Sequence, residues 1–174
     1  MKHFGTTLIA AALLGATGMA RADVKAGVDA WAQGDYARAV REWRPLADAG
    51  DADAQFNLGQ AYKLGYGIEQ DMAAALMWYG RAVAQGHHRA EDNYGLLLFQ
   101  QNQQQAAMPY LQRSAARGEP RAQYLLGVAL FNGDLAPRDW TRAYALMSRA
   151  VASGVAEARG ALAQMDQHVT DAQR

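Results

Sequence analysis

The 174-residue sequence contains no cysteine and few residues of the types that most often carry out chemistry. Without cysteine the chain has no disulfide, no thiolate metal site and no cysteine for lipid attachment. Beyond residue 22 it holds three serines and two lysines, in neither a Ser-x-x-Lys nor a Gly-x-Ser-x-Gly motif. We therefore predict a protein that is not an enzyme, with no catalytic residue and no cofactor.

An excess of one charge and long apolar runs are also lacking. Basic and acidic residues number 17 each, a balance that offers nucleic acid no basic surface. No segment after residue 22 approaches the roughly 18 consecutive apolar residues of a membrane-spanning helix. His87 and His88 are adjacent and would point about 100° apart on a helix, and the methionines lie at helical core spacing. We therefore expect no metal site, no nucleic acid and no membrane insertion after removal of the leader.

The first 22 residues have the pattern of a secretory signal peptide. Lys2 precedes an apolar run from Leu8 to Leu14, and Ala20-Arg21-Ala22 offers small residues for cleavage after Ala22 or after Ala20. A short membrane anchor or a disordered start is the alternative interpretation. Cleavage after Ala22 would leave 152 residues with 15 basic and 17 acidic side chains, a net charge near −2. The pattern predicts a secreted or periplasmic protein.

Residues 51–86 contain one helix-turn-helix unit, which the rest of the chain repeats. Gly65-Tyr66-Gly67 separates two segments whose apolar residues recur at the i, i+4, i+7, i+8 spacing of an amphipathic helix. Neither amphipathic helix can bury its face alone, so the unit needs neighbours on both sides. The apolar positions are Ala54, Leu58, Ala61 and Tyr62 in the first helix and Ala75, Tyr79, Ala82 and Val83 in the second.

Glycines mark the same two positions in each unit. A glycine inside a helix costs about 1 kcal/mol relative to alanine, so its recurrence indicates close approach of the paired helix. The first helices carry Gly27, Gly59, Gly95 and Gly127, at spacings of 32, 36 and 32 residues. Gly50, Gly86, Gly118 and Gly154 close the second helices, and Asp35, Asp71, Asn102 and Asp139 are the expected N-caps of those helices.

These positions predict an all-α protein, an α-solenoid of about four helix-turn-helix repeats plus a C-terminal capping helix. The predicted helical-repeat domain covers residues 23–169. Its repeats are residues 23–50, 51–86, 87–118 and 119–154, the capping helix is 155–169, and 170–174 form a flexible tail.

Residues 54–86 also carry a family motif. Ala54-x-x-x-Leu-Gly-x-x-Tyr62, the Gly-Tyr-Gly-Ile turn, Trp78-Tyr79 and the closing Gln85-Gly86 resemble the Sel-one-like repeat, a subclass of the tetratricopeptide superfamily. The resemblance covers about residues 24–165, with less complete copies in the first and third units. It implies an α-solenoid that mediates protein–protein interaction and implies no chemistry.

In this superfamily the first helices line a concave face, and this chain places many apolar residues there. Exposed apolar surface tends to mark a contact site, and aromatic anchors tend to dominate binding energy. Each residue alone could instead belong to the core between repeats. The predicted partner-binding strip contains Val24, Val28, Trp31, Phe56, Gln60, Lys63, Asp92, Leu96, Phe99, Tyr124, Val128 and Phe131.

Two functions are consistent with these features. The first is an exported, non-catalytic scaffold that binds a protein or peptide through its concave face. The alternative is a cell-wall or glycan-binding adaptor in envelope maintenance, in which Trp31, Tyr66 and Tyr124 stack on sugars. Pelleting with purified cell-wall sacculi would favour the adaptor, whereas capture of one defined polypeptide would favour the scaffold.

Overall fold

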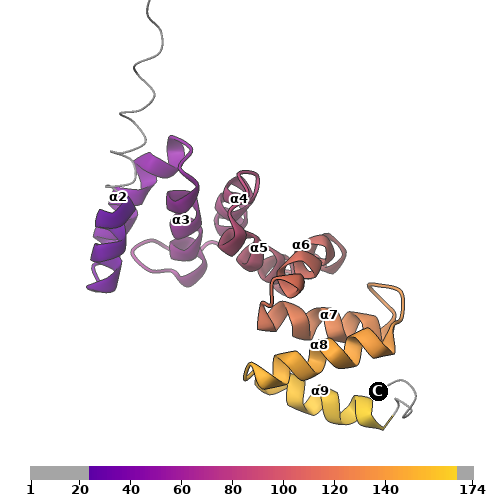
Figure 1. Cartoon of the computed structure of the whole chain (residues 1–174). Coiled ribbons are helices and arrows are strands. Elements are labelled where there is room, and N and C mark those ends of the chain that lie inside the picture. Colours follow the sequence, from indigo (N-terminus) through magenta and orange to yellow (C-terminus); the bar gives the residue numbers. More distant parts are fainter. Residues whose placement is uncertain (1–23, 168–174) are drawn as a thin grey trace, which may run out of the picture. The chain divides into compact units, whose positions relative to one another are not determined.

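The computed structural model describes residues 24–167, and those residues form helices and turns without any strand (Figure 1). The predicted signal peptide (1–22) and tail (170–174) lie outside the described residues. Residues 24–32 form the first helical stretch. The helices that follow are α2 (Tyr36–Asp48), α3 (Ala52–Leu64), α4 (Met72–Val83), α5 (His88–Gln100), α6 (Gln104–Ala116), α7 (Pro120–Asn132), α8 (Trp140–Ala152) and α9 (Ala156–Asp166).

The chain divides into two compact units between Arg81 and Ala82, a boundary that falls inside α4. In the second unit each helix from α5 to α9 contacts the next one, and the alternate helices α5, α7 and α9 also contact each other. This is the packing of stacked helical hairpins, in which the first helices of successive repeats are neighbours. The protein is therefore the all-α repeat solenoid that the sequence predicts.

The glycines inside the first helices lie against the partner helix of their own hairpin. A Cβ atom on any of the four would come within 3.3 Å of a residue on that helix. The predicted close approach is therefore confirmed. It explains why glycine occurs at these positions although its helix propensity is low. The residues that face them are Trp43 for Gly27, Tyr79 for Gly59, Tyr110 for Gly95 and Met147 for Gly127.

The glycines that follow the second helices have a left-handed backbone. Gly50, Gly86, Gly118 and Gly154 have φ angles between +79° and +100°, a region that side chains with a Cβ atom rarely adopt. Gly50, Gly86 and Gly118 each turn the chain out of one hairpin and into the next, and Gly154 turns it from the last hairpin into α9. The helix ends that the sequence predicts at these positions are therefore confirmed.

Three of the four predicted N-caps are confirmed. The carboxylates of Asp35, Asp71 and Asp139 each accept a hydrogen bond from the backbone amide three residues later, at 3.1, 2.9 and 2.9 Å. Each bond satisfies an amide in the first turn that has no partner within the helix.

The fourth predicted cap, Asn102, is wrong by one residue. Gln103 is the N-cap of α6, and its side chain makes no capping hydrogen bond. Asn102 has a φ of +59° and occupies the turn position that Gly34, with φ +80°, holds in the first repeat. Asparagine tolerates the left-handed conformation better than most residues with a side chain, so it replaces glycine there instead of capping.

The turn between α3 and α4 is held against the start of α2. A Cβ atom on Gly67 would overlap the backbone carbonyl of Tyr36, so only glycine allows this approach. The neighbouring ring of Tyr66 stacks on the ring of Tyr36, with 4.7 Å between centroids and 28° between planes. Trp31 lies beside both rings, at 4.7 Å from Tyr36 and 5.8 Å from Tyr66.

The last described helix, α9, packs on α8 and contacts α7. It buries Ala158 and Met165. Ala163 lies 36 residues after Gly127, the same step that separates Gly59 from Gly95, yet Ala163 is exposed. Within residues 24–167, no helix follows to cover this position of α9.

Candidate functional site

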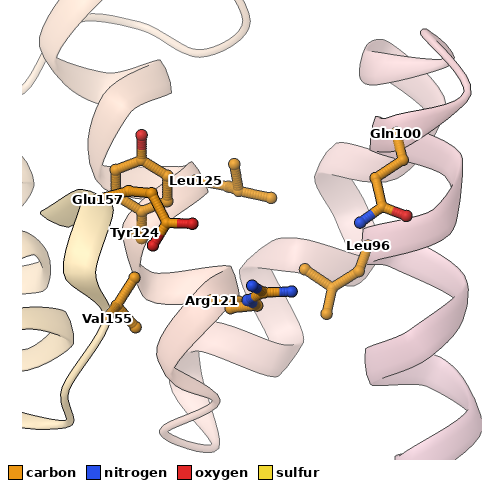
Figure 2. A pocket seen from close by; sticks show the side chains of 7 residues that line it. All are labelled: Leu96, Gln100, Arg121, Tyr124, Leu125, Val155 and Glu157. Carbon is orange, nitrogen blue, oxygen red and sulfur yellow. The ribbon is translucent and has the colours of Figure 1, made fainter.

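A hollow of about 160 Å³ opens on the second unit, where α5, α7 and the start of α9 come together (Figure 2). Helices α5 and α7 are the first helices of their repeats, which were predicted to line the concave face, whereas α9 is the helix that was predicted as a cap. The hollow is lined by Leu96 and Gln100 on α5, Arg121, Tyr124 and Leu125 on α7, and Val155 and Glu157 at the start of α9.

Helix geometry brings these side chains together. Leu96 and Gln100 are four residues apart on α5, and Arg121 is three and four residues before Tyr124 and Leu125 on α7, so each set shares one helix face. Pro120 begins α7, and the carboxylate of Glu119 accepts the amide of Ala122, which fixes the first turn that carries Arg121.

The polar side chains that line the hollow have no bonding partner among residues 24–167. Gln100, Arg121, Tyr124 and Glu157 make no side-chain hydrogen bond or ion pair with any residue in the described part of the chain. Figure 2 shows Arg121 directed towards Leu96, while the carboxylate of Glu157 lies beside Tyr124. The hollow therefore combines apolar side chains with one cation and one anion that no residue of the described chain pairs with.

The predicted strip residue Asp92, in contrast, is bonded to its own hairpin. Its carboxylate accepts hydrogen bonds from the Ser114 hydroxyl at 2.7 Å and from Arg117 at 2.6 Å. Glu91, whose side chain is 11% exposed, pairs with Arg113 at 2.5 Å and Arg117 at 2.6 Å. This network joins α5 to α6, so Asp92 stabilises the hairpin and is not free for a partner.

This network stabilises the charged form of Arg117. Burial acts to lower its pKa, but the hydrogen bonds and charges of Asp92 and Glu91 outweigh burial, so the pKa of Arg117 is raised above its usual value. Gln55 and Gln123 occupy the position of Glu91 in the neighbouring repeats and donate instead to the carbonyl oxygens of Ala47 and Ala115. At this position the third repeat has an ion-pair network within its own hairpin, whereas the neighbouring repeats have an amide hydrogen bond to the preceding hairpin.

The remaining strip residues of the second unit divide between the hollow and other positions on the same helices. The structure brings Leu96 and Tyr124 together in the hollow. Phe99 and Val128 are half-buried on α5 and α7 and do not line it. Phe131 is also half-buried, and its ring lies 6.4 Å from that of Trp140.

Most strip residues of the first unit have contacts within that unit. Phe56 is only 3% exposed, with its ring 6.0 Å from Tyr79, so it belongs to the core. The side chain of Gln60 accepts a hydrogen bond of 2.7 Å from the Tyr79 hydroxyl. Trp31 is half-buried among aromatic rings.

Three strip residues of the first unit differ in how open they are. Val28 is 45% exposed and is the most open of them. Lys63 is half-buried, and its backbone carbonyl accepts a hydrogen bond from Gln70. Val24 is buried, and its carbonyl oxygen accepts the indole N–H of Trp43 at 3.1 Å.

A second, larger hollow of about 600 Å³ lies in the first unit, beside the turn between α3 and α4. Three of its polar side chains are already bonded. Asp71 caps α4, Gln70 donates to the carbonyl of Lys63, and the Tyr62 hydroxyl accepts from Arg44 at 3.1 Å. This hollow therefore offers a ligand fewer free polar groups than the one on the second unit.

The described residues offer no metal centre, because no three His, Asp or Glu side chains of residues 24–167 are grouped so that they could hold an ion. None of the described helices combines the length and the apolar character needed to cross a bilayer.

The strip predicted from the sequence leaves out five residues of the hollow: Gln100, Arg121, Leu125, Val155 and Glu157. Gln100 was detectable, because it lies one helical turn after Leu96. Val155 and Glu157 were not, because they begin α9, which was interpreted only as a cap. Arg121 follows the proline that starts α7, where a charged residue is usually just solvated.

Comparison with protein families identifies two copies of one repeat. The Sel1 repeat matches residues 52–87 and 120–155. No curated protein matches the sequence.

Solved structures show the same fold. A Sel1 repeat protein from Oxalobacter formigenes is 26% identical with a TM-score of 0.66, over 85% of this chain and 62% of its own. A protective antigen of uropathogenic Escherichia coli strains, which displays an SLR fold, is 29% identical with a TM-score of 0.68, over 80% of this chain and 32% of its own. The chain thus spans less than two thirds of either protein.

A third structure supports the fold alone. MamA from Desulfovibrio magneticus is 22% identical with a TM-score of 0.61, over 86% of this chain and 84% of its own. The repeat matches and the stacked hairpins agree with one another: the chain contains two Sel1 repeats and has the helical-repeat fold of Sel1-like repeat proteins.

Proposed function

We propose that the protein is an exported, non-catalytic scaffold that binds a protein or peptide through the concave face formed by its first helices. The observation that carries this proposal is the hollow on α5, α7 and α9, whose polar side chains have no partner among the described residues.

Two general properties support the proposal. Sel1-like repeat folds generally serve as protein-interaction scaffolds and are generally non-catalytic. Stacked helices also hold side chains in fixed positions, so little conformational entropy is lost when a ligand docks. Tyr124 supplies an aromatic anchor, the residue type that most often dominates an interface.

Export rests on the N-terminal sequence. Lys2, the apolar run Leu8 to Leu14 and the small residues Ala20 and Ala22 form the pattern of a cleaved leader. Cell fractionation tests this part: the full-length chain should accumulate in the periplasm in a shortened form, whereas a chain without residues 2–22 should stay in the cytoplasm. Retention of both forms in the cytoplasm would contradict export.

An affinity capture from periplasmic extract tests the binding site. Wild-type protein should retain a defined polypeptide that a Leu96→Asp, Tyr124→Ala double variant loses, since removal of an aromatic hot spot weakens binding by about 30-fold or more. Met77→Glu is the matched control, because Met77 is 45% exposed and lies outside the hollow. Circular dichroism confirms that each variant is folded. Equal capture by all three proteins would contradict binding at the hollow.

One observation favours a second candidate, a cell-wall or glycan-binding adaptor. Tyr66 is 44% exposed and stacked on Tyr36 beside Trp31, which forms an aromatic surface on the first unit. Sugar rings can stack on exposed aromatic faces. Pelleting with purified sacculi tests this candidate: wild-type protein should co-sediment and Tyr66→Ala should not, whereas a supernatant that contains both would exclude it.

A further inference from the structure

We propose that the hollow on the second unit accepts a polypeptide segment with one apolar side chain flanked by an acidic and a basic side chain. The acidic side chain meets Arg121 and the basic side chain meets Glu157. This inference rests on the proposed function and adds the chemistry of the partner.

The volume of the hollow and the apolar side chains around it indicate that it accepts one apolar side chain of the ligand. Its volume of about 160 Å³ is close to the roughly 150 Å³ of an apolar cavity that holds one benzene molecule. Leu96, Leu125, Val155 and the ring of Tyr124 supply apolar surface around it. One leucine or phenylalanine side chain fills such a space, and two do not.

The two charged side chains that line the hollow determine which ligand side chains should flank the apolar one. Arg121 and Glu157 line the same hollow without an ion pair between them, and Figure 2 shows the guanidinium of Arg121 directed towards Leu96 and the carboxylate of Glu157 beside Tyr124. A ligand with charges of only one sign is attracted by one of them and repelled by the other. A ligand that carries both signs complements both.

The neighbouring charges do not change this selection. Glu91 and Asp92, also on α5, are neutralised by Arg113 and Arg117, so they add no free charge to the hollow. Gln100 contributes an uncharged amide, which can both donate to and accept from the backbone of an extended segment. A polyanion such as nucleic acid would meet the carboxylate of Glu157, which disfavours it.

Peptide selection tests the proposal without knowledge of the natural partner. A displayed library of random peptides with a fixed central leucine is selected on wild-type protein, on Arg121→Glu and on Glu157→Lys. The wild type should enrich peptides with one acidic and one basic residue around the leucine. Arg121→Glu should enrich peptides with two basic residues, and Glu157→Lys peptides with two acidic ones. Peptides selected on the wild type should bind either variant about tenfold more weakly.

Two controls separate this inference from the proposed function. Arg159→Glu reverses an exposed charge on α9 outside the hollow and should keep the wild-type selection. Tyr124→Ala should lose the selected peptides. Peptides that depend on Tyr124 but show no change of charge among the variants would overturn the charge pattern and leave the scaffold function in place.

The other outcomes count against the inference as well. No enrichment would overturn the peptide chemistry inferred here, and enrichment that Tyr124→Ala leaves unchanged would overturn binding at the hollow in both proposals. Self-association of the wild type that either charge reversal abolishes, without any selected peptide, would identify a second copy as the occupant instead.

Discussion

The ring of Tyr79 on α4 lies against the backbone of Gly59 on α3, and a Cβ atom on Gly59 would come within 2.7 Å of its Cδ1 atom. The hydroxyl of the same ring donates to Gln60 on the neighbouring position of α3. A missing side chain on one helix thus makes room for a large one on the other, and this pairing sets the distance between the two helices.

Replacement of Gly59 by alanine should lower stability. The overlap with Tyr79 costs about 1–3 kcal/mol, which exceeds the gain in helix propensity of about 1 kcal/mol. We expect a melting temperature lower by about 2–4 °C for each kcal/mol of net loss, measured by thermal unfolding. The control is Gly160→Ala in α9, where a Cβ atom meets nothing within 4 Å and should raise stability. A shift of both variants in the same direction would contradict the packing role of Gly59.

Removal of Arg117 should destabilise the second unit. Arg117→Ala leaves Glu91 and Asp92 adjacent on α5 with only Arg113 and Ser114 as partners. Breaking a buried ion pair costs about 3–5 kcal/mol, and we expect about 2 kcal/mol here because the Arg117 side chain is 30% exposed. Urea unfolding measures the change.

The control for Arg117 is Arg121, another arginine of the same unit that has no partner among residues 24–167. Arg121→Ala removes a cation that makes no ion pair or hydrogen bond with a described residue, so its effect should stay within about 0.5 kcal/mol. Equal losses from the two variants would show that the network does not stabilise the hairpin.

Stability should fall in alkaline solution in a way that depends on Tyr79. Burial raises the pKa of Tyr79 above its ordinary value of about 10. Below that pH the tyrosine is protonated in both states and contributes no pH dependence. Above it, the unfolded chain loses the proton while the folded chain keeps it, so the free energy of unfolding falls by up to about 1.4 kcal/mol per pH unit.

The Tyr79→Phe variant tests this assignment. Urea unfolding between pH 9 and 11, a range set by the reference pKa of about 10, should show a shallower loss of stability than in the wild type. Part of the slope should remain, because burial and the neighbouring Tyr110 also raise the pKa of Tyr94. At neutral pH the variant should lose about 1 kcal/mol with the hydrogen bond to Gln60. An unchanged alkaline slope would contradict the role of Tyr79.

The sequence was sufficient for features that depend on local geometry. Gly118 needs a left-handed backbone and Asp139 caps through an amide three residues away, so both could be read from the order of residues. The glycine inside each first helix was equally informative, because helix propensity gives no reason for it.

Features that depend on distant partners could not be predicted. Asp92 and Gln60 have the spacing of concave residues, but their bonding partners lie 22 and 19 residues later, on the second helix of the hairpin. Phe56 was expected to contact a partner, yet the position of the Tyr79 ring places it in the core. The sequence also carries no signal of the division inside α4, because Arg81 and Ala82 both favour helix.

The start of α6 offers a test of the corrected turn. Gln103 is its N-cap and makes no side-chain bond, whereas the aspartates at the equivalent positions of α2, α4 and α8 all do. Gln103→Asp should therefore bond the amide of Ala106 and place a negative charge at the helix start, which raises stability by about 1 kcal/mol in urea unfolding. Asn102→Asp is the matched control and should give no gain, because residue 102 has φ +59° and lies before the cap. A gain from residue 102 and none from residue 103 would restore the N-cap that the sequence had predicted.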